Sequence, residues 1–173
     1  MAQNCLSAIS EIMQTPERHP TTFEEYLDQF AGPVGDLINC YLPHCTHPDM
    51  DKYLYDPLLR FSQNGGKRHR PLICFAACQA VGGDISRAVS SAAAIEHCQS
   101  AALIHDDIAD EGELRRGAPC MYLTEGTGIA INVGDLALML VNGTVARDDL
   151  LDDATKVRVI AELTDMTTRT VEG

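Results

Sequence analysis

The sequence is poor in positive charge, with 13 Lys and Arg residues against 25 Asp and Glu residues and a formal net charge of −12. Sequence-independent binding of nucleic acid depends on a basic surface that neutralises backbone phosphates, so this shortage argues against a nucleic-acid partner. A phosphate-bearing substrate would need a metal ion and a local concentration of cations.

The chain also lacks the segments that direct a protein to a membrane or to secretion. The apolar region Ile129 to Val141 is interrupted by Asn132, Gly134 and Asp135, and no run approaches the roughly 18 apolar residues that span a bilayer. The N-terminus has no positive segment before its apolar residues, unlike a secretory signal. The odd number of cysteines, 7, fits reduced thiols. We therefore predict a cytoplasmic protein with no transmembrane segment.

No stretch alternates apolar and polar residues with period two, so the sequence predicts helices throughout. Thr22 and Glu25 form a capping box at the start of one helix. Gly32-Pro33 predicts an interruption or kink in the same segment. Arg70-Pro71 opens another helix, which Gly82-Gly83 ends.

Three long helices are expected in the second half of the chain. Asp84 can cap a segment from residue 85 to about residue 110 that is rich in Ala and free of Gly and Pro. The other two segments cover about residues 126–147 and 152–171. A content of 45% apolar residues is enough to fill one core.

Five acids lie within the eight residues from Asp106 to Glu113. On a helix, Asp106 and Asp110 are four residues apart and share one face, so both can point at one ion. Their oxygens suit Mg²⁺, which commonly holds a substrate phosphate through one or two carboxylates and keeps several waters.

Five of the 13 cationic residues lie in two short runs, Gly65 to Pro71 and Leu114 to Gly117. These cations are Lys67, Arg68, Arg70, Arg115 and Arg116. In an acidic protein, such concentrations indicate groups that bind phosphate. Either run alone would instead indicate a solvated loop.

Five residues lie on one face of the helix that carries the acids: the polar Gln99, the small or apolar Ala102 and Leu103, and the acidic Asp106 and Asp110. Ala102 lies one turn, about 6 Å, beneath Asp106, and Ala101 is its neighbour. Neither is bulky enough to block a hydrophobic tail that runs down the helix from a metal-held headgroup. The alternative is that these alanines allow another helix to pack closely.

Another cluster, Cys40, His44, Cys45 and His47, has the residue types of a zinc site. Its spacing matches no common zinc pattern, which favours a plain loop between helices.

Four motifs between Gly65 and Asp135 together resemble the trans-type isoprenyl diphosphate synthases, which include farnesyl, geranylgeranyl and longer polyprenyl diphosphate synthases. Residues 65–71 resemble the basic motif of that family, and residues 106–110 resemble its first aspartate-rich motif. Residues 114–117 follow at the usual distance, and residues 130–135 match a recurring helix segment. A single motif would be weak, whereas several in the right order are specific. The resemblance implies an all-α isoprenoid synthase fold, a helical bundle around a central cavity.

The resemblance also assigns roles at the acidic motif. Asp106 and Asp110 would hold Mg²⁺ at the diphosphate of an allylic primer, with Asp107 supporting them. Arg115 would bind the same diphosphate.

For isopentenyl diphosphate, the resemblance implies a separate cationic pocket. Lys67, Arg70 and Arg116 would grip its diphosphate, and Gln99 would contact it. Arg68 receives no role.

The implied reaction joins isopentenyl diphosphate to the allylic cation left when the primer loses its diphosphate, and gives a trans-polyprenyl diphosphate. Ala101 and Ala102 occupy the positions that limit product length in the family. Small residues there predict a geranylgeranyl or longer product.

Family members have roughly twice this length, and the second aspartate-rich motif is missing. We therefore expect residues 1–173 to be the N-terminal part of a single domain, inactive or nearly so alone, and the whole enzyme to be a homodimer. One alternative is a non-catalytic small subunit of a full-length synthase, although such subunits tend to lose the metal motif. The others are a class I terpene cyclase, which has no use for Lys67 and Arg70 as an isopentenyl diphosphate pocket, and a plain helical scaffold.

Overall fold

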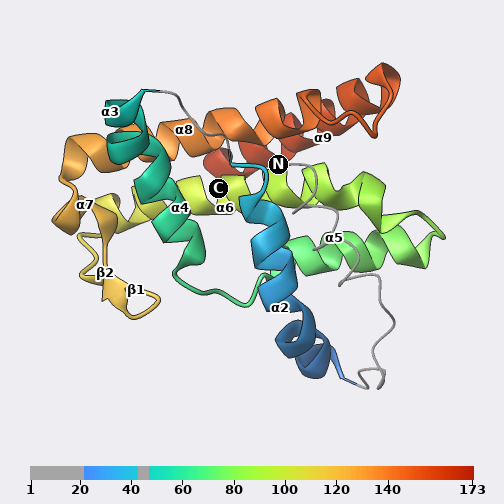
Figure 1. Ribbon diagram of the computed structural model, residues 1–173, viewed down its shortest axis with the longest axis horizontal. Helices are drawn as coiled ribbons and strands as arrows, with labels where there is room; N and C mark the ends of the chain where they lie inside the picture. Colours follow the sequence, from blue (N-terminus) through green and yellow to red (C-terminus); the bar gives the residue numbers. More distant parts are fainter. Residues whose placement is uncertain (1–21, 43–46) are drawn as a thin grey trace.

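The computed structural model describes residues 22–42 and 47–173, which form a helical assembly (Figure 1). The helices are α2 (Phe23–Asn39), α3 (Pro48–Met50), α4 (Asp56–Gln63), α5 (His69–Ala80), α6 (Val89–Ala109), α7 (Met121–Thr124), α8 (Thr127–Ala146) and α9 (Asp153–Glu172). A π-helical turn (Asp51–Tyr55) precedes α4, and a 3₁₀ turn (Ile85–Ala88) precedes α6. The predicted all-α class is confirmed.

The described part of the chain contains one small hairpin that the sequence did not predict. Strands β1 (Leu114–Arg115) and β2 (Ala118–Pro119) are antiparallel, with Arg115 opposite Ala118. The turn between them contains Gly117, whose φ of 81° suits glycine. Each strand has only two residues, too few to show a period-two pattern.

Helix α6 is the central element of the fold. It packs along α8 and also contacts α2, α5 and α9. In Figure 1, α6 and α8 run lengthwise through the molecule, and α2 lies at a steep angle to both and packs against α6.

Three clusters of buried side chains make up the core, and each includes residues of α6. The first joins α2 and α5 to the start of α6, and contains Val34, Leu72 and Val89. The second joins α4 and α8 to the end of α6, and the third joins α8 and α9 to its middle. Because α6 contributes to all three clusters, its two ends are held in fixed positions relative to α4 and α5.

The predicted capping by Thr22 and Asp84 is confirmed. Of the interruption or kink predicted at Gly32-Pro33, the interruption is wrong and the kink is not tested. The Thr22 hydroxyl accepts a hydrogen bond from the Glu25 amide at 3.1 Å, and Asp84 caps the 3₁₀ turn by accepting from the Ser86 amide at 2.9 Å. Helix α2 continues through Pro33. An internal proline costs about 3 kcal/mol, and the burial of apolar side chains on either side of it, including Phe30 and Val34, offsets that cost.

Helix α8 is relevant to the prediction that the chain has no membrane-spanning segment. It has 20 residues and a mean hydropathy of 1.6, so by length and composition it is apolar enough to cross a membrane. Many of its apolar residues, such as Ala130, Val133 and Ala137, are fully buried in the core. A core helix has the same composition, and the absence of a transmembrane segment stays a prediction.

Candidate functional site

The first basic run forms the loop that leads from α4 into the first turn of α5, and we call residues 65–70 the basic loop. Gly65 and Gly66 have φ values of 79° and 118°, which side-chain-bearing residues rarely adopt. Lys67 and Arg70 are exposed, and Arg70 lies in the first turn of α5. The amide end of a helix favours anions, so both side chains are placed where a diphosphate would be stabilised.

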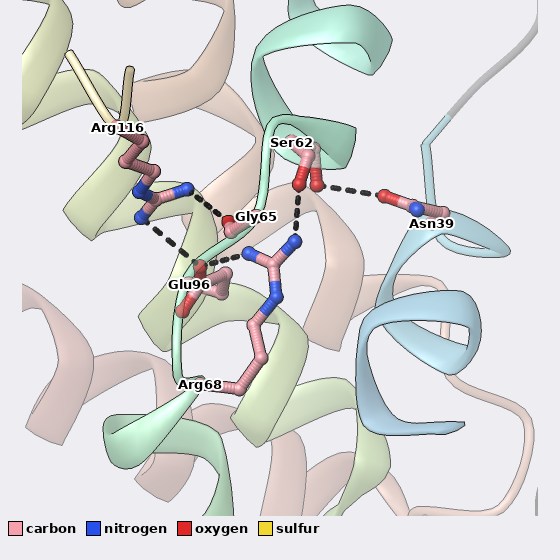
Figure 2. A network of polar contacts seen from close by, with 6 residues as sticks. All are labelled: Asn39, Ser62, Gly65, Arg68, Glu96 and Arg116. Atoms are coloured by element: carbon pink, nitrogen blue, oxygen red, sulfur yellow. Dashed lines mark hydrogen bonds and ion pairs between the residues drawn. The ribbon is translucent and has the colours of Figure 1, made fainter. Parts of the chain in front are cut away.

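Arg68, to which the resemblance assigned no role, is buried. Its backbone is left-handed (φ 49°), and its guanidinium donates to the Glu96 carboxylate on α6 and to the Ser62 carbonyl oxygen. The Ser62 hydroxyl in turn donates to Asn39 Oδ1 at 2.7 Å, as Figure 2 shows. Arg68 therefore connects the basic loop to α4 and α6 through buried hydrogen bonds.

Arg116 joins the two basic runs, which are 51 positions apart in sequence. Its Nη1 donates to the Gly65 carbonyl oxygen at 2.7 Å, and its Nη2 lies 4.0 Å from Glu96 Oε1 (Figure 2). Its guanidinium carbon also lies 5.9 Å from the centre of the Phe61 ring. The structure thus brings Arg116 to the same loop as Lys67, as a shared phosphate pocket requires.

The acidic motif lies at the carboxyl end of α6, and its three aspartates differ in exposure. Asp106 and Asp110 are exposed, and Asp110 is the C-cap residue of the helix. Asp107 is 2% exposed. Glu111 then reverses the chain with a left-handed backbone (φ 51°).

Arg115 of the hairpin reaches back to the acidic motif. Its Nε donates to Asp107 Oδ1 at 2.8 Å, and its Nη2 contacts the same oxygen. The carboxylate of Asp107 raises the pKa of Arg115. Asp107 therefore holds Arg115 close to Asp106, where the resemblance places the primer diphosphate.

The exposed pair Asp106 and Asp110 fits a magnesium ion that takes its other ligands from water and substrate. Mg²⁺ usually binds in this way, through one or two carboxylates plus phosphate oxygens. Among the described residues, no group of three or more His, Cys, Asp or Glu side chains is arranged to enclose a metal. Asp106 and Asp110 are therefore the residues that could hold such an ion.

The stripe predicted along α6 is accessible at every position. Gln99, Ala102 and Leu103 are partly exposed, and Asp106 and Asp110 are exposed. Ala101 differs, because it is completely buried in the second core cluster. Ala102 is therefore the alanine that faces the side on which a tail would run.

The cysteine and histidine cluster falls partly outside the described residues, which exclude His44 and Cys45. Cys40 is the C-cap residue of α2. The His47 Nδ1 atom accepts a hydrogen bond from the Asp49 amide at 3.3 Å and so caps α3. This capping role agrees with a connecting loop, and the zinc hypothesis is not tested.

Sequence reasoning did not identify Glu96, the carboxylate that meets both Arg68 and Arg116. Its only sequence signal is an acid within an Ala-rich apolar helix, three residues before Gln99. A charge in such a place is usually paired when it is buried.

Comparisons with known proteins identify the family of this chain. Residues 51–173 match the family model described as polyprenyl synthetase. The chain is 36% identical over 146 residues to geranylgeranyl pyrophosphate synthase 12, chloroplastic, of Arabidopsis thaliana, with coverage of 82% of this chain and 39% of that protein. It is 37% identical over 114 residues to the geranylgeranyl diphosphate synthase of Sulfolobus acidocaldarius, with coverage of 66% and 33%.

A solved structure of a geranylgeranyl pyrophosphate synthetase has a similar fold. The geranylgeranyl pyrophosphate synthetase of Pyrococcus horikoshii aligns with a TM-score of 0.75 at 31% identity, over 85% of this chain and 43% of that chain. The present chain thus has the isoprenoid synthase fold and spans about two fifths of the length of the first relatives it matches. The match of one family model from the turn before α4 to Gly173 shows that the chain belongs to the polyprenyl synthetase family.

Proposed function

We propose that the whole protein condenses isopentenyl diphosphate with an allylic diphosphate to give a geranylgeranyl or longer trans-polyprenyl diphosphate, and that this chain supplies the first half of its site. The main support for this proposal is the hydrogen bond from Arg116 to the Gly65 carbonyl oxygen. It joins two basic segments beside α6, while Asp106 and Asp110 stand exposed at the end of the same helix.

The basic loop and Arg116 would bind isopentenyl diphosphate. Lys67 and Arg70 supply two exposed cations, and Arg116 supplies a planar donor fork that matches phosphate oxygens. Gln99, on the accessible face of α6, would donate to the same diphosphate. These groups would hold the substrate double bond toward the allylic carbon, which favours reaction by proximity and orientation.

The acidic end of α6 would bind the allylic primer. Asp106 and Asp110 would hold Mg²⁺, which when bound neutralises the negative charge that grows on the departing diphosphate. Arg115, oriented by Asp107, would donate to that diphosphate and stabilise the same charge. The C–O bond of the primer then breaks, the isopentenyl double bond attacks the allylic carbon, and a proton leaves the new chain.

The partly exposed stripe beneath Asp106 would accommodate the growing tail. Ala102 leaves room beside α6, which supports a product longer than farnesyl. The names of the relatives, which are geranylgeranyl synthases, support the same length. We further propose a homodimer and a cytoplasmic location for the whole protein, to be checked by mass in solution and by imaging of a tagged full-length gene product.

The decisive experiment is a condensation assay of the full-length gene product with isopentenyl diphosphate, each allylic primer and Mg²⁺. We expect turnover that falls at least about a hundredfold in Asp106→Ala and is unchanged in Asp149→Ala, an exposed aspartate after α8. Equal turnover by the wild type and Asp106→Ala would reject the metal assignment.

The same assay separates the alternatives. A terpene cyclase would release pyrophosphate from a prenyl diphosphate without consuming isopentenyl diphosphate. A non-catalytic subunit would give no product alone, yet would change the product length of an added synthase.

A further inference from the structure

Glu96 is a carboxylate buried in the middle of α6, with 4% of its surface exposed. It precedes Asp106 by ten positions, about 15 Å along the helix axis, so it does not belong to the acidic group at the helix end. A buried carboxylate is costly unless cations and hydrogen bonds compensate it. Both of its cationic neighbours, Arg68 and Arg116, come from the two basic runs of the proposed site.

The backbone of both arginines is strained. Arg68 has a φ of 49° and Arg116 a φ of 54°; among the described residues, Glu111 is the one other non-glycine residue with positive φ. Such conformations persist only where the surroundings hold them, and they gather at functional sites. Glu96 is the charge that both strained residues approach.

Glycines lie against both guanidinium groups, and Gly66 leaves space for that of Arg116. A Cβ atom on Gly66 would lie 2.9 Å from the Arg116 guanidinium carbon, and one on Gly35 would lie 3.4 Å from Arg68 Nε. The basic loop is therefore fixed on both sides of Lys67, by Arg116 at Gly65 and by Arg68 at Ser62 and Glu96 (Figure 2).

We propose that Glu96 is a positioning residue, whose buried carboxylate holds Arg68 and Arg116 together and thereby sets where Lys67 and Arg116 present their charges to isopentenyl diphosphate. This inference rests on the proposed function. Glu96 itself does not touch the substrate, because it is buried beneath the cations. Two guanidinium groups share one carboxylate, so the cluster keeps a net positive charge for a phosphate ligand.

The test is Glu96→Gln in the full-length gene product, since glutamine keeps the size of the side chain and removes its charge. With each substrate varied in turn, we expect the KM for isopentenyl diphosphate to rise about tenfold, while kcat and the KM for the primer stay within about threefold. Glu96→Asp, which keeps the charge on a shorter side chain, should give an intermediate KM. Glu125→Gln, which removes the charge from the 2.8 Å pair between Glu125 and Arg60, should change neither KM, because this pair does not contact Glu96.

Two outcomes would overturn the proposal: an unchanged KM for isopentenyl diphosphate in folded Glu96→Gln, or an equal rise in both KM values, which indicates a general structural effect. If Glu96→Gln does not fold, the double variant Arg68→Met/Glu96→Leu replaces the buried pair by apolar side chains, an exchange that proteins often tolerate. Arg116 still loses its partner there, so the same selective rise in KM is expected, and its absence counts against the proposal.

Binding of inorganic pyrophosphate without Mg²⁺, measured by calorimetry, distinguishes failure of this proposal from failure of the proposed function. If the wild type makes no prenyl product, the proposed function fails. The positioning role would still be supported by pyrophosphate binding about tenfold tighter in the wild type than in Glu96→Gln. Equal binding by the two proteins, or none by either, would overturn it.

Discussion

Arg115 and Asp107 connect the hairpin to the last turn of α6, with Arg115 Nε 2.8 Å from Asp107 Oδ1. Asp107 is 2% exposed, whereas 34% of the Arg115 side chain is exposed. The pair therefore fixes a partly solvent-facing arginine to a carboxylate inside the protein.

Arg115→Met should destabilise the protein, because it leaves the Asp107 carboxylate buried without its cation. We expect a loss of about 2 kcal/mol in the free energy of unfolding, measured by urea denaturation. The matched control is Arg87→Met, which removes an exposed ion pair with Asp152 at 3.8 Å and should cost less than about 0.5 kcal/mol. Equal losses in the two variants would contradict a structural role for the Asp107–Arg115 pair.

Gly66→Ala should be more damaging than Gly65→Ala. Both glycines have positive φ, so alanine is strained at either position, at a cost of about 1 kcal/mol. At Gly66 the new methyl group also meets the Arg116 guanidinium at 2.9 Å, whereas at Gly65 nothing lies within 4 Å. We expect pyrophosphate binding to weaken in Gly66→Ala and to stay close to the wild-type value in Gly65→Ala. Weaker binding in Gly65→Ala than in Gly66→Ala would show that the position of Arg116 does not depend on the space beside Gly66.

The two alanines before the acidic motif should respond differently to phenylalanine. Ala102→Phe places a ring on the accessible face of α6 and should shorten the product toward farnesyl diphosphate, as seen by chromatography of the dephosphorylated products. Ala101→Phe forces a ring into the core and should destabilise the protein by about 1–3 kcal/mol. A wild-type product that ends at farnesyl diphosphate would reject the predicted length.

His97 should make stability depend on pH. Burial lowers the pKa of His97 from 6.5 to about 4. Between these values the unfolded chain binds a proton that the folded chain does not bind, so the free energy of unfolding falls as the pH falls from about 6.5 to about 4. The contribution lost is at most about 3 kcal/mol.

The check is urea denaturation at pH 7, 5.5 and 4 for the wild type, His97→Gln and the control His69→Gln, whose histidine is exposed. The loss of stability between pH 7 and pH 4 should be smaller in His97→Gln and unchanged in the control. Parallel curves for all three proteins would show that His97 is not the group responsible.

The sequence predicted the helices well because their ends are local events. Capping side chains such as Thr22 and Asp84 act within three residues, and Gly82 follows the end of α5 with a φ of 74° that suits glycine. Of the interruption or kink expected at Pro33, the interruption did not occur, because the burial of apolar side chains on either side, such as Phe30 and Val34, outweighs a local penalty.

The candidate site was only partly predictable. Spacing alone put Asp106 and Asp110 on one face, and both are exposed at the end of α6. The burial of Arg68 and its pairing with Glu96, 28 positions away, depend on how the basic loop packs against α6. No local pattern encodes such a contact, and a left-handed arginine is contrary to ordinary backbone preference.

In the hairpin of β1 and β2, two adjacent arginines contact different partners. Arg115 turns to Asp107, and Arg116 turns to Gly65 and Glu96. The register of the hairpin, in which Arg115 is paired with Ala118, therefore sets which partner each arginine contacts. Inserting one residue before Leu114 would shift this register, and under the proposed function neither guanidinium would then face the diphosphate that it is proposed to bind. The length of this short connection would then matter as much as the charges of the two arginines.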